Sequence, residues 1–124
     1  PIGSRVPFHC TASGKTFLAS LPMAKLKSFL ATLHLQAMTQ NTHVSTATLL
    51  TEIAQVRKNG YALDQEEFMD DMVAIAVPVT DPKNRYIAAL AFHGPTQRVT
   101  ISDAIKSKEL LQSAARRISE SLFA

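Results

Sequence analysis

Two apolar runs joined by a turn tetrapeptide constrain the fold of this chain more than any other feature. The runs are MVAIAVPVT (residues 72–80) and RYIAALAFHG (residues 85–94), and the tetrapeptide DPKN stands between them. Proline presets the backbone for a turn, and asparagine tolerates a left-handed φ angle. Short apolar runs bounded by such residues are typical of strands. The segment therefore predicts an antiparallel β-hairpin.

Both runs are apolar along most of their length, so neither face of the hairpin suits solvent. We expect helices to cover one face and a ligand or a protein partner to cover the other. Pro78 lacks the N–H group that a hydrogen-bonded ladder needs. Its presence predicts a β-bulge or a free sheet edge at that position.

Before Gly60 the apolar residues recur with the 3.6-residue period of helices. A first helix is expected from residue 11 or 13 to about residue 20, after a capping hydroxyl. Pro22 ends it and opens a second helix. The apolar stripe of the second helix consists of Leu26, Phe29, Leu30 and Leu33. Residues 34–43 predict a loop, and a third helix is expected from residue 45 or 46 to 59, with its stop at Gly60.

After Gly60 the period changes to 2, and residues 61–64 predict a short strand ahead of the hairpin. A last helix is expected from residue 102 or 103 to 122. Its predicted core stripe consists of Ile105, Leu111, Ala115, Ile118 and Leu122. The order α-α-α-β-β-β-α predicts an α+β domain in which helices pack on an antiparallel sheet.

Composition restricts the class of protein. A length of 124 residues with 46% hydrophobic and 19% charged residues predicts one globular domain, 1–124. No run approaches the roughly 18 apolar residues of a membrane helix. The single cysteine excludes an internal disulfide and favours a reducing, cytoplasmic setting. The chain begins at Pro1 without Met, which suggests an excised fragment.

The net charge of +3 is spread along the chain and predicts no nucleic-acid interface. The densest basic residues, Lys106, Lys108, Arg116 and Arg117, are interleaved with Glu109 and Glu120, as on a solvated helix face. If the whole protein binds DNA, we expect another part of it to do so. The four histidines never fall at i,i+4 spacing, so the sequence predicts no metal site. No cofactor is expected either.

The tetrapeptide SGKT matches the end of the nucleotide-binding pattern G-x-x-x-x-G-K-[ST]. The first glycine of that pattern is replaced by His9, and residues 1–8 make a poor buried strand, so a P-loop is rejected. A helix that opens with Ala12, Ser13 and Gly14 presents free N–H groups at its positive end, which suggests a seat for a carboxylate or another small anion. The structural alternative is that Gly14 permits close packing while Thr11 or Ser13 caps the helix.

Three further features have a structural and a functional interpretation. His9 and Cys10 could form the nucleophile pair of a thiol-dependent hydrolase, but no third orienting group is apparent, and a buried Cys10 is the favoured interpretation. His93 is either a surface residue at a strand end or a polar group at the rim of a ligand pocket. An acidic run is interpreted as a solvated connection, unless one carboxylate points into a cavity beside His93. The run consists of Asp64, Glu66, Glu67, Asp70 and Asp71.

Four segments together resemble one family. VPFHCTASGKTFLASLP, VRKNGYALDQEEF, IAVPVTD and HGPTQRV follow one another in the order and at the spacing of the isocitrate-lyase-regulator (IclR) family of bacterial transcription factors. The resemblance is to the C-terminal effector-binding domain and covers residues 3–124. It implies a GAF-like fold, a dimer or tetramer, and control of operator binding through an N-terminal winged helix-turn-helix. Nothing in the chain resembles that winged helix, and the first strands and helix of the GAF-like domain are also missing from the match.

The resemblance implies where an effector binds. The small-residue turn at the start of the first helix is one wall of the pocket, and three strands supply the rest. The implied effector-binding residues are Ala12, Ser13, Gly14, Asp64, Ala74, Ala91 and His93. The family's preference for small organic acids agrees with the anion seat inferred from the helix start. No catalytic residue is implied, so we expect a sensor and not an enzyme.

The chain departs from the common family pattern at three places. Ala74 replaces a common Cys, the stretch from Ala91 to His93 replaces a common Ser-x-Ser, and Asp71 stands at the position of a usual Gly. A methyl group and an imidazole thus replace small polar donors, which widens the pocket and makes part of it apolar. We expect an effector carboxylate with more apolar bulk than a two- or three-carbon keto acid, such as an aromatic acid. The alternatives are the thiol-dependent hydrolase and a GAF-type sensor module of a signalling protein.

Overall fold

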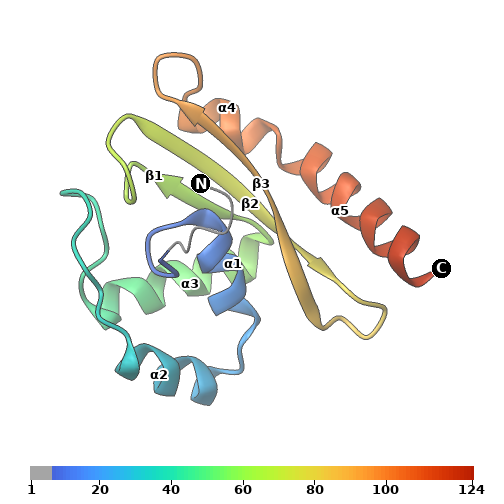
Figure 1. Ribbon diagram of the computed structural model, residues 1–124, viewed down its shortest axis with the longest axis horizontal. Helices are drawn as coiled ribbons and strands as arrows, with labels where there is room; N and C mark the ends of the chain where they lie inside the picture. The colour runs from blue at the N-terminus through green and yellow to red at the C-terminus, as the bar shows by residue number, and fades with distance from the viewer. Residues whose placement is uncertain (1–6) are drawn as a thin grey trace.

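The hairpin expected from the sequence is the centre of the structure. The computed structural model describes residues 7–124, so most of the weak strand signal in residues 1–8 lies outside the described residues. Strand β2 (Met72–Thr80) pairs antiparallel with β3 (Tyr86–Pro95), and β1 (Ala62–Gln65) pairs antiparallel with the other side of β2 (Figure 1). The sheet order is therefore β1-β2-β3. In the hairpin turn Asn84 has a left-handed φ of 61°.

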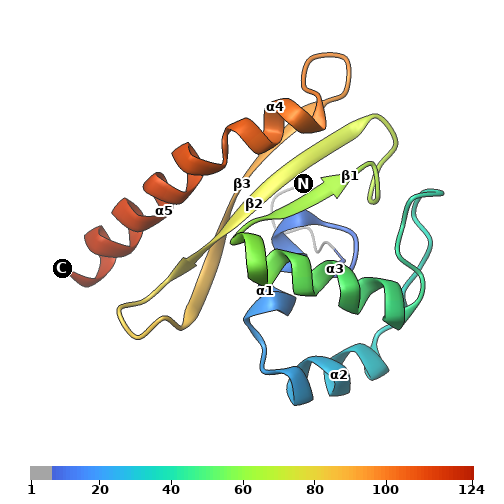
Figure 2. The ribbon, with the colours of Figure 1, turned by 180° about the vertical axis from the view of Figure 1, so that it is seen from behind.

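Helices cover both faces of β2, whereas the sequence predicted helices on one face and a ligand or partner on the other. Helix α1 (Ala12–Ser20) lies on one face and α5 (Lys108–Phe123) on the opposite face (Figures 1 and 2). Alternate residues of a strand face opposite sides. Accordingly Ala76 packs against Ala12 of α1, while Val77 packs against Ala115 of α5. For β2 the prediction was wrong, because an apolar strand shows that a face is covered but not which element covers it. For β3, where Ile87 and Phe92 are each 41% exposed, it stays a prediction.

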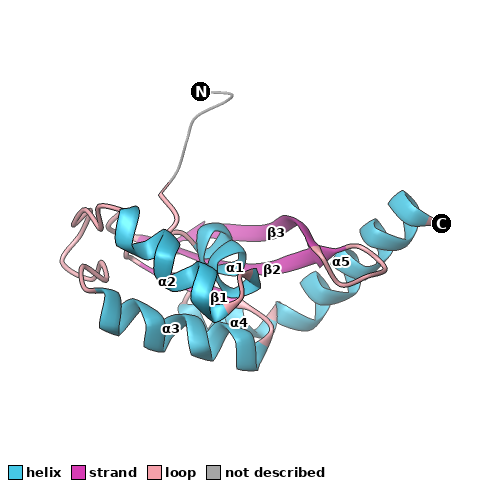
Figure 3. Ribbon diagram, turned by 90° about the horizontal axis from the view of Figure 1, so that it is seen from below, coloured by secondary structure: helices cyan, strands magenta, loops and turns pink. Residues whose placement is uncertain are grey.

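Helices α2 (Met23–Thr32) and α3 (Thr46–Asn59) pack with α1 beside the sheet (Figure 3). Their shared core consists of Leu18, Leu26, Leu30, Leu49 and Ile53. Thr11 caps α1, Ser45 caps α3, and Gly60 ends α3 with a left-handed φ of 77°. These three limits confirm the predicted helix ends. Among residues 7–124, no helix is long and apolar enough to cross a membrane.

Pro78 stands at a free edge of the sheet. Strand β1 pairs with β2 only as far as Ala76, so β2 continues beyond it without a neighbour on that side among the described residues. The carbonyl of Met72 accepts a hydrogen bond from Glu66 beside β1, so the even-numbered residues of β2 direct their backbone groups to the β1 side. The backbone nitrogen of Pro78 therefore faces the side on which β2 has no neighbouring strand, so its missing N–H costs no hydrogen bond of the sheet. The predicted edge is confirmed, and the pairing with β3 shifts register just beyond, between Val79 and Thr80.

The predicted last helix is two helices. Helix α4 (Ile101–Lys106) begins after Thr100, whose hydroxyl forms a capping box with Asp103. It ends at Ser107, which is the boundary with α5. The hydroxyl of Ser107 donates to the carbonyl of Ala104 at 2.6 Å, and its backbone N–H binds the carbonyls of Ala104 and Ile105. This tight turn interrupts the helix in a way that the apolar period does not reveal.

The interruption changes which residues of α5 face the sheet. Leu111 and Ala115 pack against the strands, and Ser119 donates a hydrogen bond to the carbonyl of Thr80. Ile118 and Leu122, which were predicted in the core, are instead 39% and 62% exposed. The core stripe of α5 thus follows positions 111, 115 and 119.

Candidate functional site

Three of the predicted site residues lie side by side across the sheet. Ala74 of β2 is paired with Asp64 of β1 and with His93 of β3. Directly paired residues of antiparallel strands project to the same face, and neighbouring strands lie about 4.8 Å apart. Asp64 and His93 therefore flank Ala74 at a backbone separation of about 10 Å. Asp64 is buried, whereas His93 is exposed.

The first turn of α1 covers this face of the sheet. Ala12 is 1% exposed and forms a buried cluster with Ala74 and Ala76, against which Ala91 of β3 also packs. Methyl groups on both sides allow the helix to approach the strands closely. The structure thus brings Ala12, Ala74 and Ala91 into contact, with Asp64 and His93 on either side of them.

Gly14 and Ser13 differ in what they do. A Cβ atom on Gly14 would lie 2.5 Å from the Cα and carbonyl oxygen of Phe8, so only glycine fits beneath that backbone. The N–H of Gly14 donates to the hydroxyl of Thr11 at 3.0 Å. Gly14 therefore has the packing and capping role that the sequence left as an alternative. The N–H groups of Ala12 and Ser13 have no hydrogen-bond partner among residues 7–124.

A cavity of about 320 Å³ opens beside this turn, between α1 and β3. It is lined by Phe8, Ser13, Gly14, Phe17, Tyr86 and Ala89. The ring centroid of Phe17 lies 5.1 Å from that of Phe8 and 5.6 Å from that of Tyr86. The aromatic walls were missed in the sequence. Phe17 follows Ser13 by four positions in the predicted helix, and this spacing is the signal that could have placed the two residues together.

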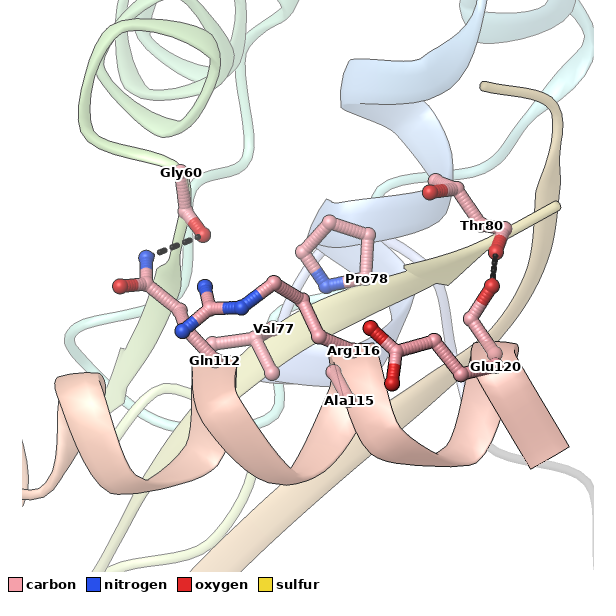
Figure 4. Close-up of a pocket in the computed structure, with 9 residues that line it drawn as sticks. Gly60, Val77, Pro78, Thr80, Gln112, Ala115, Arg116 and Glu120 are labelled. Carbon is pink, nitrogen blue, oxygen red and sulfur yellow. Dashed lines mark hydrogen bonds between the residues drawn. The ribbon is translucent and has the colours of Figure 1, made fainter. Parts of the chain in front are cut away.

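Two larger cavities lie toward the other end of β2. One of about 560 Å³ has lining residues from α1, α3 and the hairpin turn, including Arg57 and Arg85. The other, of about 470 Å³, lies between α5 and the free edge of β2 (Figure 4). There Gln112 donates a hydrogen bond to the carbonyl of Gly60 at 3.3 Å, which ties α5 to the end of α3. Neither cavity is lined by a predicted site residue.

The acidic run after β1 is not the solvated connection that its composition suggested. Asp64 and Glu67 are only 6% and 4% exposed. The Asp64 carboxylate accepts a hydrogen bond from the Glu67 N–H at 2.9 Å, which folds the chain back after β1. Burial, and then the neighbouring Glu67 carboxylate, raise the pKa of Asp64. The solvated interpretation is therefore wrong for these two residues.

Cys10 is fully buried, as predicted. Burial raises the pKa of its thiol to about 11, and the carboxylates of Asp64 and Glu67 act in the same direction. A nucleophilic thiolate needs a pKa shifted the opposite way. The Nε2 atom of His9 lies 2.8 Å from the carbonyl oxygen of Gln36, so this imidazole binds the loop after α2. The arrangement gives no support to a thiol-dependent hydrolase.

Comparison with known proteins identifies relatives over nearly the whole chain. A family model described as the C-terminal region of the bacterial transcriptional regulator IclR matches residues 1–120. The transcriptional repressor AllR of Escherichia coli K12 is 35% identical over 122 residues, which cover 98% of this chain and 45% of AllR. The chain thus spans about half the length of the curated relatives it matches.

Solved structures share the fold. The C-terminal domain of the E. coli regulator KdgR matches with a TM-score of 0.88 and 37% identity, over 96% of this chain and 73% of that one. The inducer-binding domain of Acinetobacter PobR, a double mutant in complex with 3-hydroxybenzoic acid, matches with a TM-score of 0.91 and 31% identity, over 96% of this chain and 69% of that one. The predicted α+β fold is confirmed. The chain belongs to the IclR family of bacterial transcriptional regulators and corresponds to their C-terminal effector-binding domain.

Proposed function

We propose that this domain binds a small organic acid with an aromatic body, in the cavity between the first turn of α1 and β3. The observation that carries the proposal is the composition of that cavity. Three aromatic side chains, Phe8, Phe17 and Tyr86, line it together with Ser13. At the same turn no described residue uses the N–H group of Ser13, which lines the cavity, or that of the buried Ala12 beside it. An aromatic ring with one carboxylate matches both features.

The two ends of such a ligand would be held by different forces. The carboxylate accepts hydrogen bonds from the first-turn N–H groups, where the helix dipole also favours an anion. The ring packs against the aromatic walls, where each well-placed pair contributes roughly 0.5–1.5 kcal/mol beyond burial. His93 lies on the same face of β3 as Ala89, which lines the cavity, but four residues farther along the strand and outside the lining; its contact with the far end of the ligand is part of the proposal. PobR, whose inducer-binding domain was solved with an aromatic acid, supports this ligand class.

The proposed output is a change in DNA binding. In the whole protein, an N-terminal winged helix-turn-helix would bind the operator. The effector domains would assemble into a homodimer or homotetramer, which would set the distance between the DNA-binding domains. A ligand that binds one quaternary arrangement more tightly shifts the equilibrium toward it by the ratio of its two affinities. No bond needs to be made or broken, so the proposed domain is a sensor and not an enzyme.

A thermal-shift series tests the ligand class. The panel is 3-hydroxybenzoate, benzoate, pyruvate and glyoxylate, each with the unsubstituted protein, His93→Ala and the control His34→Ala. His34 is an exposed histidine in the loop after α2, away from the cavity. At about one hundred times its dissociation constant a ligand adds about 2.7 kcal/mol, which raises the melting temperature by several degrees.

We expect the aromatic acids to raise the melting temperature and the keto acids to leave it unchanged. The shift should shrink in His93→Ala and persist in His34→Ala. A response to the keto acids alone contradicts the aromatic assignment. Equal shifts in both histidine variants contradict the placement of the site beside His93.

A further inference from the structure

Lys15, the third residue of SGKT, is the most deeply buried charge near the proposed cavity. Its side chain is 0% exposed. The ammonium Nζ lies 2.6 Å from the Glu67 carboxylate, 2.7 Å from the Leu63 carbonyl and 3.4 Å from the Glu52 carboxylate. Lysine is almost never fully buried unless it is paired. One charge on α1 is thus joined to β1, to the loop after β1 and to α3.

The buried charges beside the site do not balance. Lys15 contributes one positive charge, while Glu67 and Asp64 are two buried carboxylates. Asp64 directly follows Leu63, the β1 residue whose carbonyl binds the Lys15 ammonium. The other ionisable groups packed around the pair are Glu52, which is 26% exposed, and His43, whose Nε2 lies 3.6 Å from Glu67. A carboxylate bound at the first turn of α1, where Ser13 and Gly14 line the cavity, would therefore lie beside the helix that carries this cluster and its excess of buried negative charge.

The effect of Lys15 extends beyond its own contacts. Its positive charge acts to lower the pKa of both Asp64 and Cys10, and the negative charge of Glu67 acts to raise both. Asp64 lies in the row beside Ala74, and Cys10 immediately precedes the cap of α1. The field of the Lys15–Glu67 pair thus acts on the β1 end of the Asp64–Ala74–His93 row and on the residue before the cap of α1, the helix whose first turn lines the cavity through Ser13 and Gly14.

We propose that Lys15 is a specificity-determining residue, whose buried ammonium offsets Glu67 and so lets the cavity prefer an organic anion to its neutral analogue. The inference rests on the proposed function. Contact between Lys15 and the ligand is not required, because unit charges several ångströms apart still interact appreciably in a protein interior. One unit of buried charge should change the affinity for an anion on the order of tenfold.

A charge series separates this role from a structural one. The buried groups Lys15, Glu67 and Asp64 together carry a net charge of −1 in the unsubstituted protein. It becomes 0 in Glu67→Gln, −2 in Lys15→Met, and −1 again in the double variant Lys15→Met/Glu67→Gln. The measured quantity is the ratio of the dissociation constants of benzamide and benzoate, by titration calorimetry. Glu52→Gln, which alters a longer and partly exposed contact, is the matched control.

The ratio should be largest in Glu67→Gln, similar in the unsubstituted protein and the double variant, and smallest in Lys15→Met, with steps of about tenfold. Glu52→Gln should leave it near the starting value. A structural role would weaken both ligands together and leave the ratio constant, which overturns the proposal. If Lys15→Met does not fold, Glu67→Gln and the double variant still differ only at position 15, by the Lys15 charge and its hydrogen bond to the Leu63 carbonyl.

A ligand-free measurement keeps the two proposals distinguishable. If the unsubstituted protein binds neither benzoate nor benzamide, the proposed function fails but the role of Lys15 can still be tested. Cys10 is the single cysteine, so its thiolate is followed during a pH titration by the difference in ultraviolet absorbance between each variant and the same variant carrying Cys10→Ala, which cancels the signal of the two tyrosines. Its midpoint should be higher in the double variant than in Glu67→Gln. Equal midpoints would mean that the Lys15 field does not reach the site.

Discussion

The carboxyl group of Asp64 is buried beside a second carboxylate, and both conditions raise its pKa. The folded protein therefore binds the Asp64 proton more tightly than the unfolded chain does. As pH rises through the carboxyl range this proton is lost, and Asp64 lowers the free energy of unfolding. Asp64→Asn keeps an oxygen that accepts the Glu67 N–H while removing the charge. We expect it to raise the free energy of unfolding at pH 7 by on the order of 1 kcal/mol.

Urea unfolding at several pH values checks this expectation. The advantage of Asp64→Asn should disappear in acid, where the native carboxyl is protonated and also neutral. A variant that is less stable than the unsubstituted protein at pH 7 would show that the charge of Asp64 is compensated in the fold. A stabilising result would fit a residue kept for ligand binding at a cost in stability.

Cys10 gives a second pH dependence, at the alkaline end. Its thiol has a pKa of about 11 in the folded protein and 9.0 in the unfolded reference. Between these values the folded state binds the extra proton, so stability falls as pH rises. The expected loss from pH 9 to pH 11 is roughly 2–3 kcal/mol. Denaturant unfolding over this range should show a shallower decline in Cys10→Ala, and equal declines would contradict the assignment.

Asp71 shows what a single position contributes to a family pattern. It has a left-handed φ of 62°, a conformation that glycine adopts without steric cost. This accounts for the glycine that the family resemblance places at this position. Asp and Asn tolerate the same conformation better than most residues. The departure from the pattern at Asp71 therefore preserves the backbone path into β2.

At the scale of elements, Pro78 protects the free edge of β2. It removes an N–H from an edge that β1 leaves uncovered, and exposed N–H groups at sheet edges promote pairing with other chains. We expect Pro78→Val to change the free energy of unfolding by less than about 1 kcal/mol, because no ladder bond is gained or lost. The variant should instead self-associate more strongly as concentration rises.

Sedimentation velocity over a concentration series measures that association. Pro82→Ala, in the exposed hairpin turn, is the control for the loss of a proline ring away from the edge. Both variants are compared with the unsubstituted protein, which sets the baseline. Association that is unchanged in Pro78→Val would show that the neighbouring helices already shield the edge.

The elements that could be predicted are those whose ends are encoded locally. Thr11, Ser45 and Gly60 mark helix limits through their own hydrogen bonds or φ angles. In the same way, the left-handed φ of Asn84 marks the turn between the two hairpin strands. The break at Ser107 could not be predicted, because its hydroxyl bonds to a carbonyl three residues back within an apparently continuous period. Local chemistry therefore predicts where an element begins more readily than where it is interrupted.

At the scale of the whole molecule, the candidate site is assembled from residues far apart in the chain. The resemblance to the IclR family implied that Asp64, Ala74 and His93 line an effector pocket; the structure sets them in one row across the sheet, and their role in binding stays a prediction. The aromatic walls and the burial of Lys15 were not anticipated. Phe8, Phe17 and Tyr86 come into contact only when α1 lies on β3. The ion pair of Lys15 could not be predicted either, because its partner Glu67 lies 52 residues later in the sequence.

The location of the site is itself testable, because the fold offers cavities on both faces of β2. Hydrogen exchange with and without saturating 3-hydroxybenzoate compares residues 8–17 and 86–93, around the proposed site, with 111–120 of α5, beside the cavity of Figure 4. A ligand that bridges α1 and β3 must leave before either can open locally, so exchange there should slow by up to about a hundredfold at one hundred times the dissociation constant. Residues of α5 should exchange at an unchanged rate, because α5 packs on the opposite face. Protection confined to α5 would assign the ligand to the cavity between α5 and β2 and would contradict the site beneath α1.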